Sequence, residues 1–215
     1  SEVEWKKTFT TPQGLQLTPI LAARADGYLL NVDNPNQIAP GTYNYAGNFV
    51  DQDAAARAML TAGLEVKYPM LITNGFSSHI VEPIGQIFVR PDERYAGGLP
   101  NEDSQSFVFD ATTLFDRDKF SGYDRVEGGT RANIGLRYRG VYDNGIMVDG
   151  LFGQSFQLAG ANSFASPDLV GVGLESGLET ERSDYVGAAQ ISFPFGIGLN
   201  GSARFDETDF SLQRT

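Results

Sequence analysis

The chain has 215 residues, with 27 Asp or Glu against 16 Lys or Arg, so that its formal net charge is -11. This balance excludes nucleic acid as the main partner, because binding to a phosphate backbone depends on clustered Lys and Arg. The 25 Gly residues argue against a coiled coil or helical bundle, and no apolar run reaches the ~20 residues of a membrane-spanning helix. Without Cys there is no disulfide and no thiolate metal site.

Apolar and polar residues alternate in one segment after another, which indicates β-strands. In chain order these segments are 3–9, 15–23, 60–68, 80–90, 131–138, 146–157, 185–193 and 197–205, with a further start near Phe210. The Asn144-Gly145 pair between two of them predicts a tight hairpin. Residues 51–60 (DQDAAARAML) are the only helix candidate, and a loop is the alternative for them.

Short and long connections alternate strictly along the chain. They are short at 10–14, long from Gly27, short from Pro69, long from Pro91, short at 143–145, long from Ala159 and short near Phe195. Outer-membrane barrels have short periplasmic turns at one end and long extracellular loops at the other, whereas a soluble sandwich has no reason for this order. The sequence therefore predicts an all-β, antiparallel, transmembrane β-barrel of the outer membrane, with one apolar face toward lipid and one polar face toward the lumen.

The strand count predicts only part of such a barrel. The chain begins inside an alternating segment, and 211–215 read like the beginning of a strand. The terminal strands of outer-membrane barrels pair to close the sheet, so an abrupt polar stop leaves an open edge. We therefore expect residues 1–215 to form a single region of about eight to nine strands from a larger barrel.

Three segments in the middle of the chain carry a family resemblance: 80–92 (IVEPIGQIFVRPD), 101–118 (NEDSQSFVFDATTLFDRD) and 120–138 (FSGYDRVEGGTRANIGLRY). They resemble the LPS-assembly protein family LptD, also called organic solvent tolerance protein. Segments 5–9, 55–68 and 203–207 are similar to alphaproteobacterial members, so the resemblance extends over nearly the whole chain.

The resemblance implies a function in lipopolysaccharide transport at the bacterial outer membrane. Members of the family receive lipopolysaccharide from a periplasmic bridge of Lpt proteins through an N-terminal jellyroll, and release it laterally among the membrane lipids. A lipoprotein, LptE, plugs the lumen of their barrel. The jellyroll and the closing strands are expected to lie outside this chain, and no catalytic residue, cofactor or metal is implied.

Several charged residues of the middle segments are candidates for a polar site. Asp116, Asp118 and Asp124 lie in the long acidic loop, where we expect solvated carboxylates, some of them paired with Arg117, Arg125 or Arg131. The spacing lacks the pattern of a calcium loop, so divalent binding is only the alternative.

Arg125, Arg131, Arg137 and Arg139 could contact lipid A phosphates or pair with carboxylates of the lumen, and parity favours lumen pairing for the last three. On the lipid face near the membrane midplane, each charge would cost ~2–4 kcal/mol.

Two other functions remain open from the sequence. A porin or passive transporter would share the alternation of loops, although it would not explain the family resemblance. A barrel hydrolase acting on lipid would need a nucleophile and a base on one face. Ser77, Ser78 and His79 are adjacent, but neighbours in a strand point to opposite faces, so we expect His79 to be a polar residue near a periplasmic turn and no residue to be catalytic.

Overall fold

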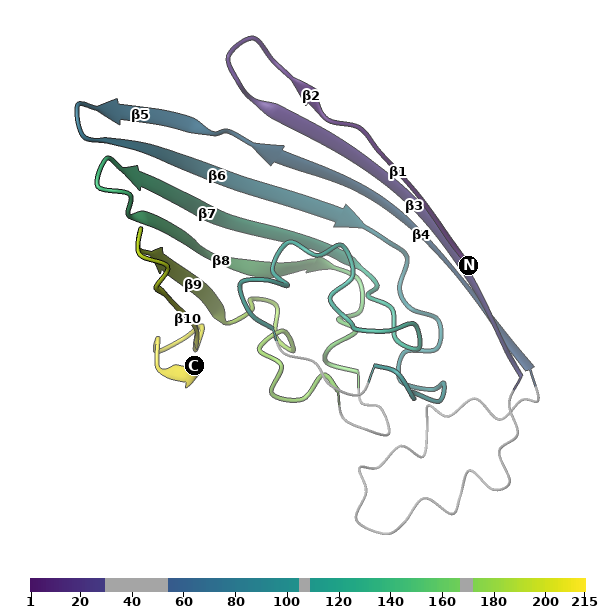
Figure 1. Cartoon of the computed structure of the whole chain (residues 1–215). Coiled ribbons are helices and arrows are strands. Elements are labelled where there is room, and N and C mark those ends of the chain that lie inside the picture. The colour runs from purple at the N-terminus through teal and green to yellow at the C-terminus, as the bar shows by residue number, and fades with distance from the viewer. Residues whose placement is uncertain (30–53, 105–108, 167–171) are drawn as a thin grey trace.

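A computed structural model describes residues 1–29, 54–104, 109–166 and 172–215, and these residues form one antiparallel sheet (Figure 1). No helix of the described residues is long and apolar enough to cross a membrane. The strands are β1 (Glu2–Lys6), β2 (Phe9–Thr10), β3 (Gln16–Leu29), β4 (Ala54–Lys67), β5 (Met70–Asn74), β6 (Ser77–Val89), β7 (Thr130–Tyr142), β8 (Met147–Ala159), β9 (Tyr185–Ser192), β10 (Gly198–Phe205) and β11 (Leu212–Arg214).

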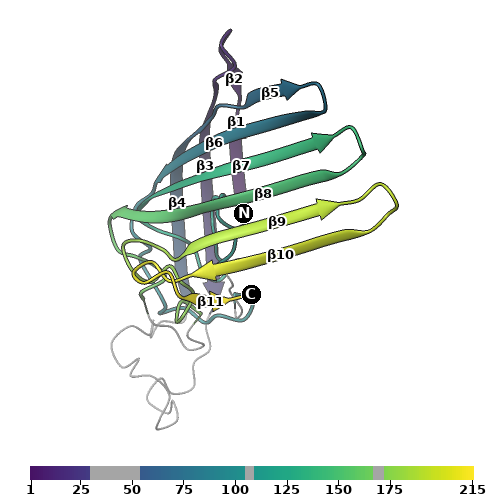
Figure 2. The ribbon, with the colours of Figure 1, turned by 90° about the vertical axis from the view of Figure 1, so that its left-hand side faces the viewer.

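Nine strands follow one another across the sheet in the order β1-β3-β4-β6-β7-β8-β9-β10-β11, while β2 pairs with β3 and β5 pairs with β6. This confirms the predicted antiparallel arrangement of about eight to nine strands. The sheet is not closed in the described residues, because β1 and β11 lie at its two edges. It curves around the described loops, and the short turns lie at one end of the strands, opposite the long connections (Figures 1 and 2).

The hairpin predicted at Asn144-Gly145 is present. The amide of Gly145 donates to the carbonyl of Tyr142 at 2.9 Å, and Gly145 has a φ of 81°. This left-handed conformation favours glycine, which has no Cβ to clash with the backbone.

Two local predictions were wrong. Residues 54–60 of the helix candidate belong to β4, and residues 51–53 lie outside the described part. The alanines of this segment are compatible with either structure, and pairing with β3 across the whole length of β4 decides in favour of a strand. The connection expected from Pro69 contains β5, which extends the hairpin with β6 through register pairs from Met70–Val81 to Asn74–Ser77.

The two faces of the sheet differ in chemistry. We call the face that carries Arg24, Arg57 and Arg131 the inner face, and the opposite one the outer face. Exposed apolar side chains of the outer face include Leu21, Leu60, Leu64, Ile87, Ile134, Leu136, Phe152 and Leu199. Buried polar side chains of the inner face include Arg24, Arg57, Gln86, Arg131, Asn133 and Ser155. The alternation that predicted the strands thus separates an apolar surface from a polar one.

The hydrophobic core lies between the inner face and the loops that cover it. It comprises Phe109, Leu114, Phe120, Phe164, Val172 and Leu178 from the long connections and Val186 from β9. The described loops are therefore packed against the sheet, and their position decides which part of the inner face is accessible.

The outer face is expected to contact acyl chains, and two neighbouring alanines of β9 test this. Ala189 is exposed on the outer face, and Ala188 lies on the inner face. In the full-length protein, Ala189→Arg should lower the free energy of unfolding in a bilayer by ~2–4 kcal/mol if the position lies near the midplane. Ala188→Arg should cost much less, because its charge reaches a polar surface. Equal costs, measured by denaturant titration in liposomes, would contradict the assignment of the faces.

Candidate functional site: the inner face of the sheet

The described part of the long connection between β6 and β7, residues 90–104 and 109–129, folds back onto the inner face. Leu114 and Phe115 of this loop lie over a pair of opposed glycines, Gly135 of β7 and Gly153 of β8. A Cβ atom at Gly135 would lie 2.9 Å from Phe115 Cζ, and one at Gly153 would lie 2.6 Å from Leu114 Cδ2. The loop can approach the sheet this closely because both positions lack a side chain.

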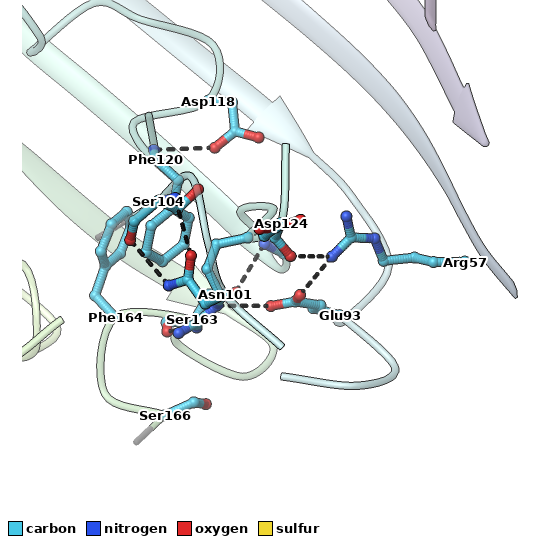
Figure 3. Close-up of polar contacts among 12 residues, drawn as sticks. Arg57, Glu93, Asn101, Ser104, Asp118, Phe120, Asp124, Ser163, Phe164 and Ser166 are labelled. Atoms are coloured by element: carbon cyan, nitrogen blue, oxygen red, sulfur yellow. Dashed lines mark hydrogen bonds and ion pairs between the residues drawn. The ribbon is translucent and has the colours of Figure 1, made fainter. Parts of the chain in front are cut away.

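Arg57 of β4 fixes one side of this loop. Its Nη1 donates to Glu93 Oε1 at 3.0 Å and to the carbonyl oxygen of Asp124 at 2.8 Å, both in the loop (Figure 3). Its Nη2 donates to Asp26 Oδ2 at 2.9 Å and to the Tyr28 hydroxyl at 2.6 Å, both on β3. The side chain is 1% exposed. A buried guanidinium needs such partners, so Arg57 ties the loop to two strands of the sheet.

Glu127 forms a second buried ionic contact between the loop and the sheet. Its Oε1 lies 2.6 Å from Nε of Arg131, at the start of β7, and 3.5 Å from Nη1 of Arg90. Its Oε2 accepts the backbone N–H of Lys119 at 3.2 Å. One carboxylate thus compensates two buried guanidinium groups and holds a distant part of the same loop.

The connection between β8 and β9 is joined to the first loop by polar and aromatic contacts. Arg125 Nη2 donates to the carbonyl of Ser163 at 2.7 Å, and Arg125 Nε lies 3.8 Å from Glu93 Oε2. The Phe120 and Phe164 rings stack with centroids 4.3 Å apart, and the Arg125 guanidinium lies 4.6 Å from the Phe120 ring centroid. The two loops therefore form one packed body on the inner face (Figure 3).

Burial shifts the ionisation of several groups in this body. Desolvation raises the pKa of Glu93 despite its arginine partners. Desolvation also acts upward on the pKa of Glu127, but the charges of Lys119 and the neighbouring arginines outweigh it and hold that pKa below its usual value. Desolvation, aided by the negative charge of Glu127, raises the pKa of Asp118 to about 6. Desolvation lowers the pKa of Lys119 to about 8.

Beside the loops, a ladder of polar side chains crosses four strands of the inner face. Gln86 Nε2 donates to Glu65 Oε2 at 2.6 Å, and Asn133 Nδ2 donates to Gln86 Oε1 at 3.2 Å. Ser155 Oγ donates to Asn133 Oδ1 at 2.7 Å. Buried polar groups stabilise only when their hydrogen bonds are made, and this ladder satisfies them from β4 to β8.

The other half of the inner face, toward the short turns, is open. A groove of about 670 Å³ there is lined mainly by residues of β6 to β10, among them Glu82, Arg137, Arg139, Asp149, Gln190 and Asn200, and also by Gln16 of β3 and Thr112 of the loop between β6 and β7. Arg137 Nη1 lies 3.3 Å from Glu82 Oε1, and Arg139 Nε lies 2.6 Å from Asp149 Oδ1. The arginines and Asp149 of these cross-strand ion pairs are exposed and Glu82 is partly buried, unlike the pairs under the loops, which are buried.

The structure separates the sequence-predicted carboxylates from the arginines expected to pair with them. Asp124 Oδ2 accepts the backbone N–H groups of Glu102 at 2.6 Å and Asp103 at 3.1 Å. Asp118 Oδ1 accepts the N–H of Phe120 at 3.1 Å, and Asp116 contributes its backbone carbonyl to Lys119. These aspartates therefore stabilise the loop backbone.

The arginines of the expected pairs have other partners. Arg125 is close to Glu93, and Arg131 pairs with Glu127. Arg117 pairs with Glu2 and Glu4 of β1. The acidic partners were missed because a carboxylate that folds onto a buried arginine looks like any other loop residue in the sequence. The position of Glu127 four residues before Arg131 was the one local signal.

His79 lies on the outer face near the short turns. Its Nε2 is 2.8 Å from Ser77 Oγ and its Nδ1 is 2.8 Å from the Tyr138 hydroxyl, while its ring meets Tyr142 edge to face. Ser77 and His79 point to the same face because they are two residues apart in a strand. A comparison of adjacent residues alone does not predict this contact. The ring lies opposite Gly140. His79 and its neighbours thus form a cluster of polar and aromatic side chains at the ends of the strands, which is typical of the aromatic girdle at a membrane interface.

The described residues contain no group of three or more His, Asp or Glu that could hold a metal ion. The described residues form an open antiparallel sheet. The sheet has an apolar outer face and a polar inner face, with short turns at one end and long loops at the other. This is the construction of an outer-membrane β-barrel segment.

The comparisons with known proteins specify the family. The whole chain, residues 1–215, matches the family model of LptD, described as LPS transport system D. The chain therefore belongs to the LptD family, and its function is that of the barrel in lipopolysaccharide transport and assembly. This favours transport over the porin and the lipid hydrolase that the sequence left open. No curated protein sequence matches the chain.

The buried carboxylate of Glu127 should be far more important for stability than an exposed one. In the full-length protein, Glu127→Gln leaves Arg90 and Arg131 buried without their counterion, and should lower the free energy of unfolding by ~3–5 kcal/mol. The matched control is Glu82→Gln, whose partner Arg137 is 48% exposed, with an expected cost of ~0–1 kcal/mol. Denaturant titration in detergent micelles measures both, and similar losses would show that the loop contacts are not buried in solution.

Asp118→Asn tests the pKa of Asp118. Since that pKa rises from 3.8 to about 6 on folding, the folded state binds a proton that the unfolded chain has lost, and stability falls as the pH rises from about 4 to about 6. At pH 4 the variant and the parent should be equally stable. At pH 7 the variant should be more stable by about 2–3 kcal/mol. The test is to measure the free energy of unfolding of both proteins between pH 4 and pH 7. A difference between variant and parent that does not depend on pH would contradict the raised pKa of Asp118.

Proposed function

We propose that this chain forms part of the wall of a lipopolysaccharide translocon in the bacterial outer membrane. The observation that carries the proposal is the family match over residues 1–215, on a sheet whose outer face is apolar and whose inner face is polar. In this arrangement the outer face contacts membrane lipids, the short turns point to the periplasm, and the long loops lie at the cell surface.

Transport in this wall requires no bond to be made or broken. Saccharide and phosphate groups need a polar environment, whereas acyl chains need an apolar one. The groove at the short-turn half of the inner face offers the first, and the outer face offers the second. Lipopolysaccharide therefore keeps its polar part in the lumen while its acyl chains move toward lipid.

The family of the chain suggests its partners. We assign to this system a periplasmic Lpt bridge that delivers lipopolysaccharide through an N-terminal jellyroll, and an LptE-like lipoprotein that plugs the lumen. The open half of the inner face has the polarity that a soluble protein segment in the lumen would require.

Residues 1–215 act as a single region of the barrel domain, because all nine strands of the main path belong to one hydrogen-bonded sheet. The strands that close the barrel, and the jellyroll, belong to other parts of the protein. Within the region, Arg125 and Arg131 hold the loops on the inner face, while Asp116, Asp118 and Asp124 shape the loop between β6 and β7. Arg137 belongs to the open groove.

Photo-crosslinking from the two neighbouring alanines of β9 tests the proposal. A photoreactive amino acid is placed at Ala188, which lines the groove, or at Ala189, on the outer face, in the full-length protein in growing cells. The variant at 188 should crosslink to the saccharide part of lipopolysaccharide or to a lipoprotein. The variant at 189 should crosslink only to acyl chains, since the outer face borders the membrane lipids and the inner face borders the transport path.

Crosslinks to saccharide or to a lipoprotein in equal yield from both positions would contradict a transport path that borders only the inner face. Crosslinks to saccharide only from position 189 would mean that the two faces have been assigned the wrong way round.

A further inference from the structure

The arginines Arg24, Arg57, Arg131, Arg137 and Arg139, on the inner face of the sheet, fall into two sets that differ in burial. The side chains of Arg24, Arg57 and Arg131, in the half covered by loops, are 8%, 1% and 1% exposed. Those of Arg137 and Arg139, in the open half, are 48% and 61% exposed. The two sets lie on one continuous surface, and β7 carries members of both.

In the buried set, Arg57 and Arg131 are already held by several partners. The guanidinium of Arg57 already donates to two carboxylates, a tyrosine hydroxyl and backbone carbonyls. Arg131 is held by Glu127, Ser155 and Asn162. Replacing such a partner would leave a buried charge without its counterion. The free-energy cost of this would be far larger than the gain from one new contact.

The exposed set is different, because an exposed ion pair contributes only ~0–1 kcal/mol. Arg137 and Arg139 each pair with a single carboxylate, Glu82 or Asp149. In both pairs the arginine is more exposed than its partner. Arg137 is 48% exposed and Glu82 is 14% exposed, while Arg139 is 61% exposed and Asp149 is 39% exposed. An incoming anion can therefore reach either guanidinium. It can replace Asp149 at little cost, and it can bind Arg137 beside Glu82, since a guanidinium has five N–H donors.

The two guanidinium groups project from the same face of β7, since they are two residues apart, about 7 Å along the strand. Other groove-lining residues carry neutral donors and acceptors, namely Gln16, Thr112, Gln190, Asn200 and Ser202. Hydroxyl and carboxamide groups suit the hydroxyls of a sugar, and the planar guanidinium suits a phosphate or carboxylate, which it can bind with two hydrogen bonds.

We propose that Arg137 and Arg139 form an anion site in this groove that binds the phosphate or carboxylate groups on the saccharide part of lipopolysaccharide. The proposal rests on the proposed function and adds the residues and the chemical class that they recognise. At rest, Glu82 pairs with Arg137 and Asp149 with Arg139; the ligand replaces Asp149 and joins Glu82 at Arg137. The site thus holds the polar part of the ligand in the open half of the inner face, between the short turns and the loop residue Thr112.

The experiment uses the full-length protein in its native complex, with the photoreactive residue at Ala188 and purified lipopolysaccharide, either intact or enzymatically dephosphorylated. With the parent, the intact form should crosslink about tenfold more than the dephosphorylated form. Arg137→Gln combined with Arg139→Gln should abolish this preference. The Lys pair, Arg137→Lys with Arg139→Lys, keeps the charge but not the planar fork and should retain an intermediate preference.

The matched control is Arg182→Gln, which removes an exposed arginine that is also ion-paired, with Glu207, at the long-loop end. It should leave the preference unchanged. Millimolar inorganic phosphate should not compete, because it lacks the sugar that the neutral side chains contact; full competition would mean a general anion site and would overturn the saccharide assignment.

The outcomes separate the two proposals. If the parent gives no lipopolysaccharide crosslink at position 188, the proposed transport path fails and the anion site fails with it. If the parent crosslinks but the Gln pair keeps the full preference for the phosphorylated form, the path stands and the anion site is wrong.

Discussion

The rest of this structure depends on the need of buried arginines for counterions. Arg57 and Arg131 point from β4 and β7 to the inner face of the sheet, where apolar loop residues exclude water. A guanidinium in such a place is tolerated only with a carboxylate in contact. Glu93 and Glu127 supply these carboxylates, and both belong to the connection between β6 and β7. The loop must therefore lie on the inner face.

This constraint divides the inner face into two halves with different properties. Toward the long connections, charged groups are buried in ion pairs, and aromatic residues of two loops pack beside them. Toward the short turns, Arg137 and Arg139 remain exposed, and a groove borders them. A surface that is closed at one end and open and polar at the other suits a polar ligand arriving from the short-turn side, which is the direction that transport from the periplasm requires.

The strands could be predicted because a period of two is a local property, visible in the sequence without knowledge of any partner. The family was recognisable from the middle segments, and the match over residues 1–215 confirms it. The helix candidate failed because its alanines have no strong preference for a strand, and pairing with β3 decided the outcome. The expected partners of Arg117, Arg125 and Arg131 failed for a related reason, since contacts between distant residues leave no periodic signal.

The sequence by itself determined the strands, the chemistry of each face and the alternation of short and long connections, because these depend on neighbours along the chain. Only the tertiary structure decided where the long loops lie. It also decided that Glu93 and Glu127, and not Asp116, Asp118 or Asp124, compensate the buried arginines. A loop of polar and apolar residues is compatible with many positions in solution. Buried charges on the sheet, and a glycine pair that admits Leu114 and Phe115, select the position in which the buried arginines have carboxylate counterions.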